Sequence, residues 1–132
     1  MFIGQALRRP TKPLCSSAHT LRNQTLARQK FEAIFALNGC TDASRAVIDR
    51  FSATSGVNTI ILEDPVANVA RARNAALQSA KFRLATFVDH DDHISRAYLE
   101  EAMALGDCRS VVVSNIIKIE NDTLVEDYAQ TV

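Results

Sequence analysis

The sequence predicts an α/β fold, with an open, mostly parallel sheet and helices on both of its faces. Three observations support this class. Short apolar segments alternate with segments of helical composition, which is typical of βαβ units. Their spacing suits right-handed crossovers between parallel strands. The chain has 132 residues, 47% of them hydrophobic, which is enough for one domain with its own core but short for two.

The charge and cysteine content exclude several classes of protein. Fifteen basic and fifteen acidic residues leave a formal net charge of zero, which argues against nucleic-acid binding by bulk positive charge. Apolar runs reach only about half a dozen residues, so we expect no transmembrane segment and a cytoplasmic location. The three cysteines are far apart and odd in number, so we expect reduced thiols rather than a disulfide framework or a CxxC metal site.

The first segment has no clear periodicity. Residues 1–17 contain two prolines and several basic residues, so we expect a basic, irregular arm there and a single domain over residues 18–132. Residues 18–29 lack Gly and Pro and place Leu21, Thr25 and Arg28 at helical spacing, which predicts a modest amphipathic helix.

The following residues predict the first βαβ unit. Residues 31–37 read FEAIFAL, a short, mostly apolar run that ends at Asn38-Gly39 and therefore fits a strand entering a tight turn. A helix with an apolar stripe comes next, and Thr41 or Asp42 can cap its N-terminus.

The alternation continues to the end of the chain. A turn at residues 120–122 is expected to join the last two strands into a C-terminal β-hairpin. Further strands are predicted at residues 57–62, 84–88, 110–119 and 123–128, and helices at residues 68–80 and after Ser95, a possible N-cap.

An acidic run follows one predicted strand directly, at the carboxyl end where open parallel sheets bind ligands. Residues 89–93 read DHDDH, and carboxylates this close raise one another's pKa unless a cation or several donors compensate. One interpretation is a Mg²⁺ or Mn²⁺ site that faces a phosphorylated ligand. The other is that Asp91 or Asp92 caps the next helix and the remaining residues are solvated. For His90 and His93, an exposed or satisfied imidazole is the commoner case.

Two other segments are suited to a phosphate. Residues 38–42 offer a turn that glycine permits, backbone amides and a helix N-terminus. Arg71, Arg73 and Asn74 lie near the start of the next helix, where either arginine can reach a diphosphate; the alternative is an ordinary solvated helix face. Neither signal is specific on its own.

The order of these motifs is more specific than any one of them. LNGCTD at residues 37–42, ARN at 72–74, DHDD at 89–92 and YL at 98–99 follow one another along the chain, and LRNQT stands upstream at 21–25. This order resembles the nucleotide-sugar-binding half of family 2 glycosyltransferases of the GT-A fold. That family carries D-[DN]-G-S-T-D, A-R-N, D-x-D-D and Y-L in the same order, with L-x-x-Q-T before them. The resemblance covers about residues 21–128.

The resemblance implies transfer of a sugar from a UDP- or GDP-sugar to an acceptor hydroxyl, with Mn²⁺ or Mg²⁺ as the cofactor. Arg73 would orient the nucleotide, and Asp89 would contact the ribose or hold the loop. The residues that the resemblance assigns to the nucleotide-sugar site are Asn38, Gly39, Asp42, Arg73 and Asp89, and those that it assigns to the metal are Asp91 and Asp89.

The sequence departs from the family pattern in three places. Leu37 stands where members often carry the aspartate that reads the nucleobase. The family's first strand, which ends in P-x-[YR]-N, has no match in residues 1–17, and the chain ends before the acceptor-side segment and the general base of inverting members. We therefore expect a fragment truncated at both ends, with no residue assigned as general base. A missing first strand would expose a central sheet edge, which favours a homo-oligomer.

Two alternatives stay open at this point. The domain can be a catalytically incompetent remnant that binds a nucleotide or a partner, and metal-dependent UDP or GDP binding without transfer would favour it. It can also be a small metal-dependent phosphohydrolase, whose turnover would be lost in Asp91→Ala. Its acidic and histidine residues would be Asp89, Asp91, Asp92 and His93. The sequence indicates no particular acceptor.

Overall fold

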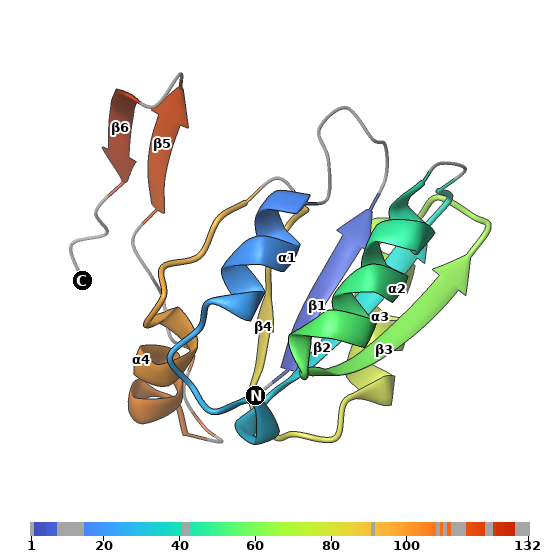
Figure 1. Ribbon diagram of the computed structural model, residues 1–132, viewed down its shortest axis with the longest axis horizontal. Coiled ribbons are helices and arrows are strands. Elements are labelled where there is room, and N and C mark those ends of the chain that lie inside the picture. Colours follow the sequence, from blue (N-terminus) through green and yellow to red (C-terminus); the bar gives the residue numbers. More distant parts are fainter. Residues whose placement is uncertain are drawn as a thin grey trace.

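A computed structural model of the chain describes residues 2–7, 15–40, 43–90, 92–107, 109, 111, 116–120 and 123–128. These residues form a four-stranded sheet with helices packed on it and a separate two-stranded sheet (Figure 1). The predicted α/β class, with an open parallel sheet, is confirmed.

The main sheet has the strand order β3-β2-β1-β4, and all of its neighbouring strands are parallel. Because the strands run in one direction, their carboxyl ends lie at the same edge of the sheet (Figure 1). The strands are β1 (Phe2–Leu7), β2 (Glu32–Asn38), β3 (Asn58–Asp64) and β4 (Ala85–Phe87).

Strand β1 shows that the prediction of an irregular arm over residues 1–17 is wrong. It pairs with β2 on one side and with β4 on the other, so a first strand is present inside the sheet. Gly4 and Gln5 interrupt its apolar run, which hides the strand in the sequence pattern. Backbone hydrogen bonds to two neighbours stabilise it regardless of that pattern. Helix α1 (Cys15–Arg22) also begins inside the predicted arm.

The position of β1 removes the reason for predicting a homo-oligomer. That prediction depends on an exposed edge at β2, but β1 pairs with this edge from Glu32 to Leu37. The outer strands of the described sheet are β3 and β4 instead.

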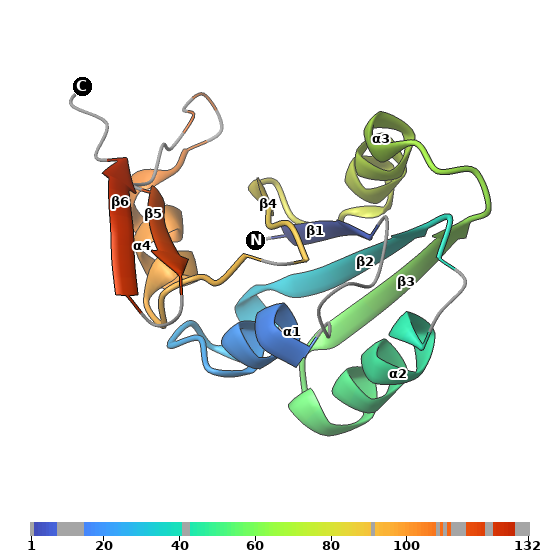
Figure 2. The ribbon, with the colours of Figure 1, turned by 90° about the horizontal axis from the view of Figure 1, so that it is seen from above.

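Alternate residues of β2 belong to the cores on opposite faces of the sheet. Phe35 lies in the larger core, where its ring meets that of Phe51 edge-on with a centroid distance of 5.5 Å. Ile34 points the other way and packs with Ala76. Both cores are therefore built on one strand that is buried along its full length. Figure 2 shows α1 and α2 (Ser44–Ser55) on one face and α3 (Val69–Ser79) on the other.

Helix α4 (Tyr98–Leu105) begins later than predicted. Its N-cap is Ala97, which makes no side-chain cap, and not Ser95. The Ser95 carbonyl instead accepts a hydrogen bond from the Tyr98 amide at 3.2 Å. Elsewhere the agreement is close, because the predicted strands at residues 31–37, 57–62 and 84–88 and helix at 68–80 correspond to β2, β3, β4 and α3.

The helix predicted over residues 18–29 is interrupted. Helix α1 ends at Arg22, and the next element is the 3-10 turn η1 (Arg28–Lys30). Gln24 and Thr25, which lie between them, hydrogen-bond to the chain just before and within α4. Tertiary contacts therefore override a weak helical pattern.

The C-terminal strands β5 (Ile116–Glu120) and β6 (Thr123–Tyr128) pair antiparallel in a sheet of their own. A strand is predicted over residues 110–119, and β5 lies at Ile116–Glu120. Residues 110 and 112–115, and residues 121 and 122 of the predicted turn, lie outside the described residues. Across the described parts of the chain, no helix has the length and apolar character needed to cross a membrane.

Candidate functional site

The carboxyl edge of the main sheet gathers the residues that the sequence singles out. Asn38 is the last residue of β2, Asp64 is the last residue of β3, and Asp89 follows the end of β4 by two residues. Since ligands of open parallel sheets bind at this edge, we take these strand ends as the candidate site.

The turn after β2 is built around Gly39. Its φ of +66° is a left-handed conformation that glycine adopts without strain. The Gly39 amide donates to the Asp64 carbonyl at 2.8 Å, which joins the ends of β2 and β3. A Cβ at this position would lie 3.0 Å from Cβ of Ala67, so a side chain there would require Ala67 to shift. The sequence prediction of a glycine-dependent turn is confirmed.

Asn38 connects this turn to helix α3. Its side chain is fully buried, and Oδ1 accepts a hydrogen bond from the Asn68 amide at 2.6 Å. Within the described ranges, Nδ2 is a buried donor without a hydrogen-bond partner. An unsatisfied buried donor costs about 1–3 kcal/mol, so an acceptor at this position would be bound favourably.

Arg71 holds the start of α3 to the end of β3. Its Nε lies 2.7 Å from Oδ2 of Asp64, and its amide donates to the Asn68 side chain, which caps the helix. The other oxygen of Asp64 accepts from the Val66 amide at 3.0 Å. The sequence offers two arginines for a diphosphate, and one of them, Arg71, already forms a structural ion pair with Asp64.

Arg73 faces the end of β4. Its guanidinium donates to Oδ1 of Asp89 at 3.0 Å, and its central carbon lies 5.5 Å from the centroid of the Phe87 ring. Both charged side chains remain about half exposed, so a ligand can reach them. The structure thus brings together two of the predicted site residues from α3 and from the strand end.

The acidic run after β4 begins with a turn, in which the Asp92 amide donates to the Asp89 carbonyl at 3.0 Å. Asp91, and likewise Thr41 and Asp42 of the first motif, lie outside the described residues. No group of three His, Cys, Asp or Glu residues able to hold a metal occurs among those that are described.

The donor set at the end of β4 nevertheless suits a hard cation. The ion pair with Arg73 uses Oδ1 of Asp89, which leaves Oδ2 as a carboxylate oxygen. Mg²⁺ in nucleotide sites commonly takes one or two carboxylates and completes its shell with water and phosphate oxygens. The described carboxylate of Asp89 is therefore compatible with a Mg²⁺ or Mn²⁺ ion that takes its other ligands from water and phosphate oxygens.

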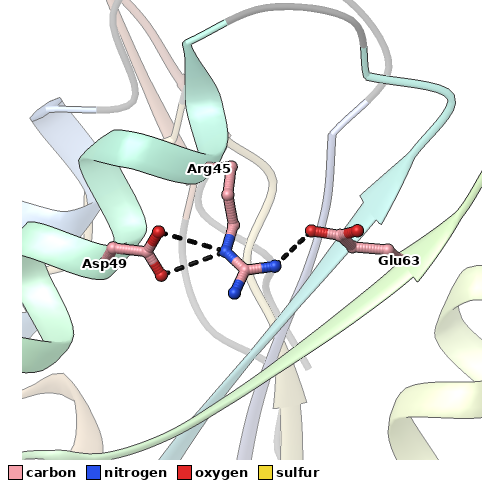
Figure 3. Close-up of polar contacts among 3 residues, drawn as sticks. All are labelled: Arg45, Asp49 and Glu63. Carbon is pink, nitrogen blue, oxygen red and sulfur yellow. Dashed lines mark hydrogen bonds and ion pairs between the residues drawn. The ribbon is translucent and has the colours of Figure 1, made fainter.

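An ion-pair network beside the site is not indicated by the sequence reading. Arg45, in the first turn of α2, lies 3.0 Å from Asp49 and also pairs with Glu63 near the end of β3 (Figure 3). Hydrogen bonds to Glu63 and then to Asp49 raise the pKa of Arg45. The Arg45–Asp49 pair has the i, i+4 spacing that a sequence can reveal, whereas the Glu63 contact depends on the fold. The network holds the start of α2 against β3.

Leu37, which stands where family members often carry the aspartate that reads the nucleobase, does not line the site. Its side chain is 5% exposed and belongs to the larger core cluster. Cys40, just beyond the Gly39 turn, is partly buried and packs against the larger core.

The chain is thus an open, parallel α/β domain with a glycine turn and an arginine–aspartate pair at the carboxyl edge, which is where domains of this class bind their ligands. The family model described as glycosyl transferase family 2 matches residues 11–131. The chain therefore belongs to glycosyl transferase family 2, as the motif order predicts.

Curated and solved relatives are consistent with this assignment. The chain is 26% identical over 89 residues to poly(ribitol-phosphate) beta-N-acetylglucosaminyltransferase TarS of Staphylococcus aureus, a match that covers 67% of this chain and 16% of that protein. A crystal structure of S. aureus TarS with UDP-GlcNAc superposes with a TM-score of 0.72 at 21% identity, over 78% of this chain and 30% of that one.

A second neighbour has a different donor. The mannosyltransferase PcManGT from Pyrobaculum calidifontis, in complex with GDP-Man and Mn²⁺, gives a TM-score of 0.68 at 20% identity, over 77% of this chain and 31% of that one. At about 20% sequence identity, these structural matches show the fold alone, which is the GT-A fold. The chain spans about one sixth of the length of the curated relatives that it matches.

Proposed function

We propose that this chain forms the nucleotide-sugar-binding part of a glycosyltransferase, which binds a UDP- or GDP-sugar together with Mg²⁺ or Mn²⁺ for transfer of the sugar to an acceptor hydroxyl. The observation that carries the proposal is the pair of Arg73 and Asp89, which stands half exposed at the carboxyl end of β4. The family match and the donor complexes of the structural neighbours support it.

Each residue of the site has a role in this proposal. The turn at Asn38 and Gly39 would hold the nucleotide against β2. The N-cap of helix α2, which follows, is Ala43 with no side-chain cap, so the prediction that Thr41 or Asp42 is the N-cap is wrong. Arg73 would orient the nucleotide, because a planar guanidinium can bond a diphosphate and a carboxylate at once. Asp89 would contact the ribose and share the metal with its neighbour in the acidic run, Asp91.

The metal would neutralise the negative charge that develops on the leaving nucleoside diphosphate. The protein's own contribution is to hold Asp89 at a fixed strand end and to keep a positive charge beside it. Arg73 does this in two ways, through its ion pair with Asp89 and through its contact with the Phe87 ring.

The phosphohydrolase alternative loses its support, since it gives no role to the Asn38 turn or to Arg73 and does not agree with the family match. A binding domain without transfer is separated from a transferase only by turnover. Binding is therefore measured first, by calorimetry. Release of UDP or GDP from the bound donor sugar would then indicate turnover, and binding without release would indicate a binding domain.

Titration calorimetry of UDP and GDP into the protein, with and without Mn²⁺, tests the proposal. We expect saturable binding that requires the metal and that falls at least tenfold in Asp91→Ala and in Asp89→Asn. Asp107→Asn serves as the charge-matched control. Asp107 lies two residues beyond the end of α4, where its carboxylate accepts from the Arg109 amide at 2.8 Å, and it is none of the predicted site residues. A folded wild-type protein that binds neither nucleotide in the presence of Mn²⁺ would refute the proposal.

A further inference from the structure

The start of helix α4 lacks a cap of its own. The first amides of an α-helix have no partner within the helix and normally bond to a side chain at the N-cap. Here the N-cap residue is Ala97, whose methyl group cannot accept a hydrogen bond. The Leu99 amide in the first turn must therefore find an acceptor elsewhere.

That acceptor comes from a residue 75 positions earlier in the chain. Oε1 of Gln24 accepts from the Leu99 amide at 3.1 Å. Nε2 of Gln24 donates to the Ser95 carbonyl at 2.7 Å and to the Thr20 carbonyl at 3.1 Å. The side-chain amide of Gln24 thus caps α4 at Leu99 and bonds to Ser95, which lies two residues before the N-cap. Its bond to Thr20 connects both of them to α1. A carboxylate or an apolar side chain could not make all three bonds.

Thr25 adds two contacts to the same segment. Its amide donates to the Arg96 carbonyl at 2.9 Å, and its hydroxyl donates to Oε2 of Glu100 at 2.6 Å. We call Gln24 and Thr25 the clasp. Beneath it, Leu21, Leu26 and Leu99 lie in one buried cluster, so the polar contacts are supported by apolar packing.

The clasp fixes one end of the loop that begins at the candidate site. Residues 88–97 connect β4 with α4, and the described residues among them form only turns and irregular chain. Arg73 and the Asp92 amide hold the loop at Asp89. The clasp holds it at Ser95 and Arg96, only a few residues further on.

We propose that Gln24 and Thr25 are positioning residues for the donor site, because they set the course of the loop that carries Asp89. This inference rests on the proposed function for the identity of the ligand, but its effect on the loop can be measured without any ligand. The residues act through the loop and have no described contact with the site itself. The L-x-x-Q-T motif thereby acquires a role beyond the helix in which the sequence places it.

The test compares Gln24→Met, which keeps the length of the side chain but none of its hydrogen bonds, with Gln78→Met on the exposed side of α3. Amide exchange by NMR in the ligand-free protein is the first readout. We expect the Leu99 and Asp92 amides to exchange about tenfold faster in Gln24→Met and to be unchanged in Gln78→Met. If the Leu99 amide alone responds, the clasp caps α4 without positioning the loop, and the inference is wrong.

Thr25 provides a second and milder perturbation. Thr25→Val removes the hydroxyl with little change of shape, while Thr25→Ser retains it. We expect Thr25→Val to accelerate Asp92 exchange several-fold and Thr25→Ser to restore the wild-type rate. The lack of a difference between these two variants would count against a role of the Glu100 contact.

Nucleotide affinity in the presence of Mn²⁺ is the last readout, measured well below the unfolding temperature of every variant. We expect Gln24→Met to weaken binding about fivefold or more. If the variant unfolds at a lower temperature but binds the nucleotide as tightly as the wild type, the clasp only stabilises the fold and the inference is wrong. If the wild type itself binds neither UDP nor GDP, the proposed function fails, while the Asp92 amide still decides whether the clasp positions the loop.

Discussion

The variant Gly39→Ala tests whether the turn after β2 requires glycine. Gly39→Ala forces a residue with a side chain into a φ of +66°, which costs about 1–2 kcal/mol for an L-amino acid. The new Cβ would also lie 3.0 Å from Cβ of Ala67, and backbone atoms of Ala67 lie at 3.3 Å, so the loop before α3 must move. We add about 1 kcal/mol for this movement, by analogy with overpacked cores. The expected loss of stability is therefore about 2–3 kcal/mol.

Gly56→Ala is the matched control. Gly56 has a similar φ of +70°, but a Cβ there would meet Nη1 of Arg28, the free end of a flexible side chain, at 3.2 Å. This variant should lose only the stability that the left-handed backbone conformation costs, about 1–2 kcal/mol. The double variant Gly39→Ala with Ala67→Gly should regain the part of the loss that the close contact causes.

Urea unfolding followed by circular dichroism measures these differences as shifts of the midpoint at constant m-value. Gly39→Ala is expected to unfold at a clearly lower urea concentration than Gly56→Ala. The reasoning would be refuted by equal losses in the two variants, or by a double variant that regains nothing. Metal-dependent nucleotide binding should weaken in Gly39→Ala and stay unchanged in Gly56→Ala, since only the first turn lies at the carboxyl edge.

Three further predictions concern other parts of the molecule. Arg73→Ala should lower nucleotide affinity about tenfold in calorimetry but change stability by less than about 1 kcal/mol, because a half-exposed ion pair contributes little; Arg73→Lys keeps the charge and should recover only part of the affinity. Removal of the metal with a chelator should abolish binding of the nucleotide, and added Mn²⁺ should restore it. Glu32→Ala should destabilise the fold by about 1.5–3 kcal/mol in urea unfolding, because the fully buried Glu32 carboxylate accepts from the Lys81 amide at 2.6 Å and from the Asn58 side chain. A loss below 0.5 kcal/mol, on the order of a surface substitution, would contradict this reasoning.

The sequence predicts those parts of the fold that depend on residues close together in the chain, such as β2 and the turn that follows it. The run FEAIFAL predicts β2 because a strand buried on both faces is apolar at nearly every position. The turn at Asn38-Gly39 is predicted because the conformation there requires glycine, and Asn68 caps α3 within the range predicted for that helix. These signals lie within a few residues of the feature that they predict.

The features that the sequence misses depend on residues far apart in the chain. Strand β1 is stabilised by two partners, of which β4 begins at Ala85, and its own pattern is weak. The cap of α4 is Gln24 rather than the nearby Ser95. Of the predicted site residues, Arg73 and Asp89 are brought together, but the engagement of Arg71 with Asp64 could not be read from spacing.

The place of β1 in the sheet has a consequence for how the chain folds. β2 and β3 are neighbours in sequence and can pair soon after both have been synthesised, whereas β4 joins the sheet only through β1, across about eighty residues of chain. Until β4 arrives, one side of β1 stays open for pairing with other chains. Loss of residues 2–7 would leave β2 and β3 paired but would detach β4, and with it Asp89. Mutations near the amino end should therefore impair solubility and donor binding together.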